Sequence, residues 1–198
     1  MLSLDIPDLK KYPLAYVFEE MNLKHKEDTL WLEFGVASGR SINFISQFTS
    51  AFVYGFDSFE GLPETWRPGF EKGTFSSGGK PPAVNQNVIL KKGWFSDTLE
   101  PFLKEQDRKV SFVHIDCDLY SSTKLILDLL VPYFEPECVI VFDELVNYPG
   151  FEEGELKALQ EFVDQNNVAV EFIGMNGCLG DIGCEHEHVA LKILSKSK

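Results

Sequence analysis

Short apolar runs alternate along the chain with stretches in which apolar residues recur at helical spacing. The runs are rich in β-branched, aromatic and aliphatic residues, which is typical of buried strands. We expect strands at residues 29–34, 52–56, 88–91, 110–115 and 139–142, and a closing antiparallel pair at residues 168–173 and 188–194. We expect helices at residues 14–23, 41–48, 97–105, 122–133 and 152–166, the third of them capped by Ser96 or Asp97.

This alternation predicts an α/β fold with a doubly wound, mostly parallel sheet of the Rossmann-like type and a C-terminal antiparallel strand pair. The length of 198 residues and the lack of internal repeats favour a single domain over residues 1–198. One irregular stretch, residues 60–87, is rich in glycine and proline and carries Trp66, Phe70 and Phe75. Loops of this length tend to be functional or disordered, so we interpret it as a substrate-side lid, with a plain surface insertion as the alternative.

Two of the predicted strands end in acidic residues. Residues 110–115 lead into Asp116 and Asp118, and residues 139–142 lead into Asp143 and Glu144. Carboxylates beside a core are costly unless something compensates them, and ligands in such sheets bind at the carboxyl ends of the strands. Carboxylate oxygens suit a hard divalent cation, or one cation together with a general base. Solvated acids that cap helices are the alternative interpretation.

The first predicted strand runs into a glycine-containing turn that opens a helix. Its spacing, acid-x-Gly-x-x-x-Gly, differs from the G-x-G-x-x-G of dinucleotide sites and favours S-adenosylmethionine over NAD. Loop amides would bind the carboxylate of this cofactor and Glu33 its ammonium, while Asp57 at the end of the next strand would bind the ribose hydroxyls. The predicted cofactor-binding residues are Glu33, Gly35, Ala37, Ser38, Gly39, Ser41, Asp57, Ser58, Gly93, Trp94, Phe95 and Asp116.

Charge and cysteine content narrow the choice of partners. The net charge is -13, from 31 acidic and 18 basic residues, which argues against nucleic acid and against anionic membranes. No apolar run is long enough to span a bilayer, residues 1–11 do not form a signal peptide, and scattered cysteines favour a reducing, cytoplasmic setting. A zinc site is a weaker alternative, because no CxxC spacing accompanies its candidate ligands, which are Cys178, Cys184, His186 and His188.

Four sequence blocks together resemble the macrocin O-methyltransferase family of class I S-adenosylmethionine-dependent enzymes. They are residues 33–39, 55–63, 92–99 and 114–123, within a similarity that covers roughly residues 30–162. The resemblance implies magnesium-dependent methylation of a hydroxyl, which in characterised members belongs to a sugar. It implies Asp116, Asp143 and Glu144 as magnesium ligands, although Glu144 stands where the family has Asp, and it implies Asp118 as the general base.

The expected function is therefore methylation of a small hydroxylated acceptor, either a sugar or another vicinal diol or phenol. S-adenosylmethionine would be the cofactor and Mg²⁺ the metal, with Asp116 and Asp118 as the catalytic residues. His114 is expected to be a core or supporting residue rather than a base. Self-association stays open. The alternatives are a non-catalytic S-adenosylmethionine- or nucleoside-binding protein of the same fold and a nicotinamide-dependent oxidoreductase, which the glycine spacing disfavours.

Overall fold

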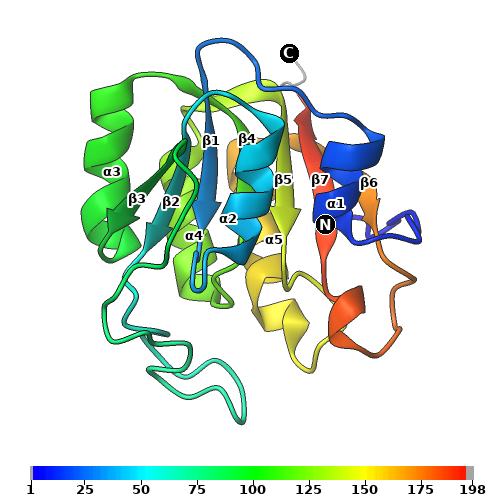
Figure 1. Ribbon diagram of the computed structural model, residues 1–198. Coiled ribbons are helices and arrows are strands. Elements are labelled where there is room, and N and C mark those ends of the chain that lie inside the picture. Colours follow the sequence, from blue (N-terminus) through cyan, green and yellow to red (C-terminus); the bar gives the residue numbers. More distant parts are fainter. Residues whose placement is uncertain (1, 195–198) are drawn as a thin grey trace.

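A seven-stranded sheet with the order β3-β2-β1-β4-β5-β7-β6 organises the computed structural model, which describes residues 2–194 (Figure 1). Strands β1 to β5 are parallel, and β7 lies antiparallel between β5 and β6. This arrangement confirms the predicted Rossmann-like fold with its antiparallel closing pair. The strands are β1 Thr29–Phe34, β2 Val53–Asp57, β3 Val88–Lys92, β4 Lys109–Ile115, β5 Phe134–Phe142, β6 Ala169–Met175 and β7 Val189–Leu194.

Helices cover both faces of the sheet. The first group packs on one face and the second on the other, as Figure 1 shows with α1 and α2 in front of the strands. The first group is α1 Pro13–Ala15, the π-helical turn η1 Tyr16–Glu20, α2 Arg40–Ile45 and the 3-10 turn η2 Ser46–Phe48. The second is α3 Phe95–Gln106, α4 Tyr120–Leu130 and α5 Glu155–Asn166, with the short 3-10 turns η3 Phe151–Glu153 before α5 and η4 Cys184–His186 before β7.

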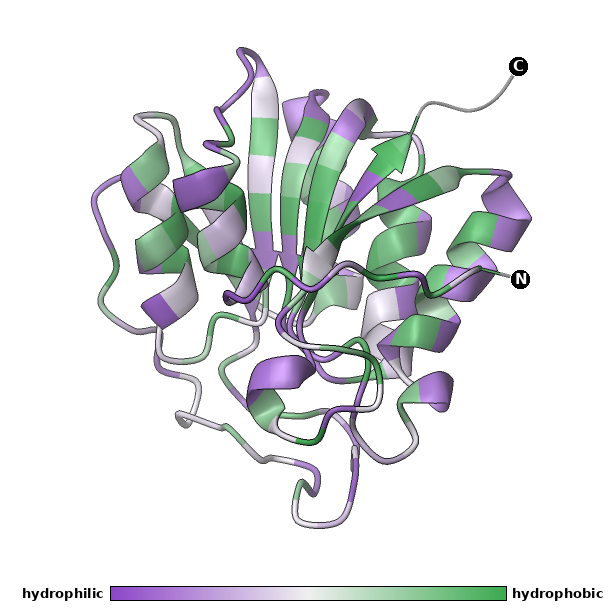
Figure 2. Cartoon of the chain, turned by 90° about the vertical axis from the view of Figure 1, so that its right-hand side faces the viewer, coloured by the Kyte–Doolittle hydropathy of each residue, from purple (hydrophilic) through white to green (hydrophobic). Residues whose placement is uncertain are grey.

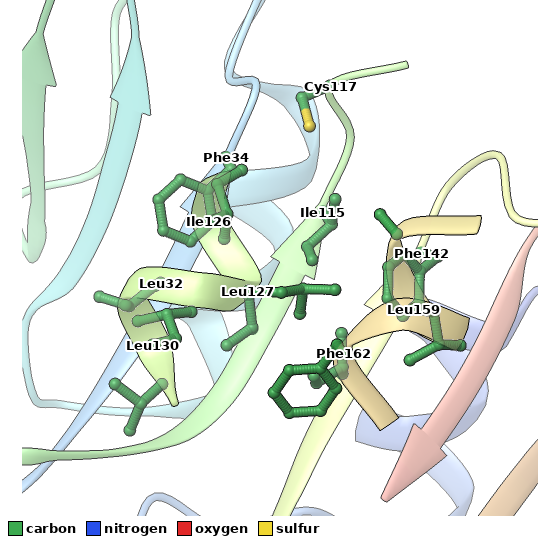
Figure 3. Packing of buried hydrophobic residues seen from close by; sticks show 14 of the residues in the cluster. Leu32, Phe34, Ile115, Cys117, Ile126, Leu127, Leu130, Phe142, Leu159 and Phe162 are labelled. Carbon is green, nitrogen blue, oxygen red and sulfur yellow. The ribbon is translucent and has the colours of Figure 1, made fainter. Parts of the chain in front are cut away.

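The central strands are buried on both faces, which explains their continuous apolar runs. Every residue of β1 is buried, and Figure 2 shows hydrophobic positions dominating the strands while hydrophilic ones mark the outer surfaces of the helices. In Figure 3 the side chains of α4 and α5 pack against the same sheet face, around Leu32, Phe34, Ile115, Ile126, Leu127, Leu130, Phe142, Leu159 and Phe162. This packing holds the ends of β1, β4 and β5 rigidly beside one another.

Several predicted boundaries were wrong for local reasons. Helix α3 begins at Phe95 with the extended Trp94 as its N-cap, because the Ser96 hydroxyl donates to the Asp97 carboxylate instead of capping. Strand β5 begins at Phe134, earlier than predicted. Its first four residues are partly or fully exposed and include two glutamates, so they do not form the apolar run that indicates a buried strand. The last predicted helix is interrupted at Gly154, where a Cβ atom would lie 1.9 Å from the Tyr148 hydroxyl.

Two irregular segments reach the carboxyl end of the parallel strands. Residues 60–87 project beyond the sheet there, as Figure 1 shows in cyan and green. The N-terminal strap, residues 7–12, is fixed to β6 by backbone hydrogen bonds from Met175 to Pro7 and from Leu9 to Met175. Within residues 2–194, no helix has the length and apolar character that crossing a membrane requires.

Candidate active site

A cavity of about 560 Å³ opens at the carboxyl ends of β1, β2, β4 and β5. It is lined by the glycine turn and the end of β2, by the acidic ends of β4 and β5, and by the start of α4. The predicted residues that line it are Gly35, Ala37, Asp57, Ser58, Trp94, Phe95, Asp116, Asp118, Asp143 and Glu144. Ser38, Gly39, Ser41 and Gly93 are not part of this lining.

The glycine turn is held by Asp57. The amides of Val36 and Ala37 both donate to Asp57 Oδ2 at 2.8 Å, and the amide of Phe59 donates to Oδ1 at 2.6 Å. Gly35 adopts a left-handed φ of 86°, and a Cβ at this position would lie 1.7 Å from the carbonyl oxygen of Asp116. The turn is therefore pressed against the end of β4, and only glycine allows this approach.

Glu33 is paired with a histidine and a serine inside the fold. Its side chain is fully buried, and its carboxylate lies 2.9 Å from His114 Nδ1 and accepts a hydrogen bond from the Ser41 hydroxyl at 3.1 Å. Burial raises the pKa of Glu33, while His114 opposes this shift. Glu33 is not among the residues that line the cavity, and its contact with a cofactor ammonium stays a prediction.

Asp116 and Asp143 come together because β4 and β5 are neighbours. The amide of Asp143 donates to the carbonyl of Ile115, which fixes the two acidic ends side by side. Burial raises the pKa of Asp116 well above its usual value, and the charge of Asp143 raises it further. Burial would also raise the pKa of Asp143, but the imidazoles of His114 and His188 hold it well below its usual range.

Two residues that were not predicted to contact Asp143 lie against it. The Tyr12 hydroxyl donates to Asp143 Oδ1 at 2.6 Å, and His188 Nδ1 lies 3.0 Å from the same oxygen. The two rings contact edge to face, with centroids 4.6 Å apart. Nothing in the sequence around Tyr12 marked it, because its contact depends on how the N-terminal strap docks on the sheet.

Asp118 occupies a strained turn at the cavity wall. Its φ is 64°, and the amide of Leu119 donates to the carbonyl of Cys117 at 2.7 Å, which closes a γ-turn around it. Burial and the charge of Asp143 raise the pKa of Asp118 to about 7, although Arg67 opposes them. A carboxyl group with this pKa can accept a proton near neutral pH.

Several contacts attach the 60–87 segment to the rest of the domain. Its last residues, Asn85 and Asn87, hydrogen-bond to residues 43–51, and Lys92 donates to the carbonyl of Gly79. Two further contacts involve its first residues. The Arg67 guanidinium lies 3.9 Å from the ring centroid of Trp66 and 4.9 Å from that of Tyr148, and it pairs with Glu187 at 3.5 Å. The Ser121 hydroxyl donates to Glu64 at 2.6 Å. Of the aromatic residues in the segment, Phe75 lines the cavity, whereas Trp66 and Phe70 stack beside Arg67.

The potential metal ligands that lie together in the structure differ in one member from the predicted set. Within residues 2–194, the group of potential ligands that lies close enough to share an ion is His114, Asp116 and Asp143, whose ligand atoms are within 4.8 Å of one another. Glu144 lines the cavity but lies outside this group, and its Oε2 is buried without a partner. The weaker zinc alternative is not supported, since the group includes none of its candidates.

Comparisons with known proteins agree with this geometry. The family described as "Methyltransferase domain" matches residues 32–145, more than half of the chain. No curated protein matches the sequence. CalS11, a calicheamicin methyltransferase, superposes with a TM-score of 0.63 at 21% identity, over 83% of this chain and 72% of its own.

Two further solved structures share the fold. The O-methyltransferase NovP superposes with a TM-score of 0.59 at 20% identity, over 84% of this chain and 72% of its own. An O-methyltransferase from Bacillus cereus, in complex with SAH, has a TM-score of 0.54 at 13% identity, over 92% of this chain and 79% of its own. At these identities the similarity establishes the fold.

Proposed function

The chain belongs to the methyltransferase-domain family, and from this premise we propose that it is an S-adenosylmethionine-dependent O-methyltransferase acting on a hydroxyl group of a small molecule. One observation carries the proposal: a single cavity is lined by the glycine turn and Asp57 and also by Asp116, Asp118 and Asp143. The cavity can therefore bring a cofactor and an acceptor together, and proximity of this kind lowers the barrier to transfer.

The cofactor would lie on the wall formed by β1 and β2. The glycine turn is held against Asp57 by the amides of Val36 and Ala37, and Asp57 lies at the end of β2, where an acid can bind ribose hydroxyls. Trp94 and Phe95 line the same end of the cavity and offer aromatic surface to the adenine. The Bacillus cereus neighbour binds SAH in the same fold, which supports this placement.

The acceptor would lie on the acidic wall, beneath the 60–87 segment, which we interpret as a lid. A divalent cation held by Asp116 and Asp143 would lower the pKa of an acceptor hydroxyl. Asp118, with its raised pKa of about 7, would take up the proton as the oxygen attacks the methyl group. Arg67 lies near enough to affect Asp118 electrostatically, so the lid contributes to tuning the base.

The acceptor class follows from the lining of the cavity. Phe75 is 53% exposed at the cavity and can stack on a sugar or aryl ring. CalS11 is described as a TDP-rhamnose 3'-O-methyltransferase, which favours a sugar or another vicinal diol over a macromolecule. Membership of the macrocin O-methyltransferase branch, a cytoplasmic location and self-association stay predictions.

Calorimetry and a turnover assay test the proposal. We expect S-adenosylmethionine and S-adenosylhomocysteine to bind, and a panel of diols, phenols and sugars to release S-adenosylhomocysteine when divalent cation is present. Asp118→Asn keeps the turn, because Asn tolerates a left-handed φ, and should lose turnover while binding S-adenosylhomocysteine normally. Cofactor binding without turnover on any acceptor would favour the non-catalytic binding protein, and NADH binding would overturn both.

A further inference from the structure

His114 lies in a position that a metal ligand would occupy. It sits in β4 with its ring fully buried, and its register partner on β1 is Glu33. Its Nδ1 lies 2.9 Å from Glu33 Oε2, while its Nε2 is buried and has no hydrogen-bond partner among the described residues. Burying an imidazole nitrogen without a partner costs free energy, and a bound ligand at this atom would offset that cost.

The unpartnered nitrogen faces the two acidic strand ends. Nε2 lies 3.8 Å from Asp143 Oδ1, which is too long for a hydrogen bond. Metal–ligand bonds of about 2.1 Å place two ligands of one ion about 3 to 4.2 Å apart, and 3.8 Å falls in this range. Asp116 completes the group.

The surroundings of His114 and Asp143 match those of metal ligands. A ligating histidine usually donates its other ring nitrogen to a carboxylate, and Glu33 supplies that carboxylate, itself hydrogen-bonded by Ser41. Ligating carboxylates are in turn held by hydrogen bonds, and the Tyr12 hydroxyl holds Asp143 Oδ1. Glu33 would then support the metal ligand His114.

We propose that His114, Asp116 and Asp143 form a site for a divalent first-row transition ion, such as Mn²⁺, Co²⁺ or Zn²⁺, in preference to Mg²⁺. Imidazole nitrogen is a good ligand for these ions, whereas Mg²⁺ favours all-oxygen sites. Glu144, which the sequence predicted as the third ligand, is not needed for this site. The inference deepens the proposed function at the same cavity, because the ion would lie where the acceptor hydroxyl is expected.

Pulsed electron paramagnetic resonance of bound Mn²⁺ tests the nitrogen ligand directly. In a nitrogen-free buffer, the wild-type protein should show coupling of Mn²⁺ to a ¹⁴N nucleus. His114→Asn keeps a donor near the Nδ1 position but removes Nε2, so the coupling should disappear and Co²⁺ affinity should fall by about 10-fold or more. His188→Asn is the matched control, since His188 contacts Asp143 but lies outside the group, and it should keep the coupling.

Binding and stability measurements keep the outcomes apart. S-adenosylhomocysteine titration and thermal melting should show that both variants are folded, and His114→Gln replaces His114→Asn if the latter does not fold. Bound Mn²⁺ without ¹⁴N coupling in the wild type, coupling that survives in His114→Asn, or Mg²⁺ binding as tightly as Co²⁺ would overturn the site. Methyl transfer supported by Mg²⁺ in that case would leave the proposed function intact. Nitrogen coupling without cofactor binding would instead overturn the function and leave the metal site.

Discussion

Replacing Gly35 with alanine should disrupt the cavity far more than it disrupts the fold. The new Cβ would lie 1.7 Å from the carbonyl oxygen of Asp116, so the two atoms must separate by about as much again to reach an ordinary contact of 3.4 Å. The left-handed φ of 86° adds strain that a residue with a Cβ tolerates poorly. Either the glycine turn or the end of β4 must therefore move, and both carry predicted ligand-binding groups.

The chain offers a matched control for the backbone strain alone. Gly150 has a left-handed φ of 84°, and a Cβ there would meet no atom within 4 Å. Gly150→Ala should cost about 1–2 kcal/mol of unfolding free energy, from the backbone conformation. Gly35→Ala should cost a further ~1–3 kcal/mol, because the overlap forces a shift in a packed region. Domains of this kind are stable by about 5–15 kcal/mol, so most of the protein should stay folded.

Urea unfolding and S-adenosylhomocysteine calorimetry measure the two effects separately. We expect Gly150→Ala to bind the ligand as the wild type does, and Gly35→Ala to bind it at least about tenfold more weakly, which corresponds to roughly 1.4 kcal/mol. If both variants lost the same stability and kept the same affinity, the tight contact between the turn and β4 would have no role in binding.

Three other changes probe the surroundings of the cavity. Burial raises the pKa of Glu155 above its ordinary value of 4.5, so the folded protein holds more protons than the unfolded chain. The wild type therefore loses stability as the pH rises above that value. In urea unfolding, the stability advantage of Glu155→Gln over the wild type should grow with pH, and a constant difference would contradict this. Tyr12→Phe removes the hydrogen bond to Asp143 and should weaken Co²⁺ binding by about 10-fold. The free energy of unfolding should change by no more than about 1.5 kcal/mol. An unchanged Co²⁺ affinity would show that Tyr12 does not support the metal site. Arg67→Ala should speed amide hydrogen exchange at residues 66–70 and raise the acceptor KM, with S-adenosylhomocysteine affinity unchanged. Exchange at these residues as slow as in the wild type would contradict this role of Arg67.

The strands were predictable because burial on both faces leaves a plain apolar run. The first residues of β5 escaped prediction because Glu135 and Glu137 interrupt that run on the partly exposed part of the strand. The acids of β4 and β5 could be paired from sequence, since the carboxyl ends of neighbouring parallel strands meet at one edge. The position of β7 between β5 and β6 depends on long-range antiparallel pairing, which local patterns do not specify.

Contacts across large sequence separations account for the rest of the site. Tyr12 reaches Asp143, 131 positions away, only because the strap crosses β6 at Gly174, where a Cβ would lie 2.5 Å from the Pro7 carbonyl. The acid-x-Gly pattern predicts Glu33 as a ligand-binding acid, but it does not indicate the pairing of Glu33 with His114. A different signal was available: Glu33 and His114 are ionisable residues within otherwise apolar strands, and such residues need each other when the strands pair.

Asp116, Asp118 and Asp143 share one environment, but it shifts their pKa values in opposite directions. Burial, and then the charge of Asp143, raise the pKa of Asp116 and of Asp118. The pKa of Asp143 is instead held well below its usual range, because the nearby imidazoles outweigh its burial. Groups whose environments separate their pKa values in this way can act as distinct charge-bearing and proton-transferring groups. Negative charge is therefore concentrated at Asp143, where a cation would bind, while Asp118, with a pKa of about 7, can exchange a proton with an acceptor near neutral pH.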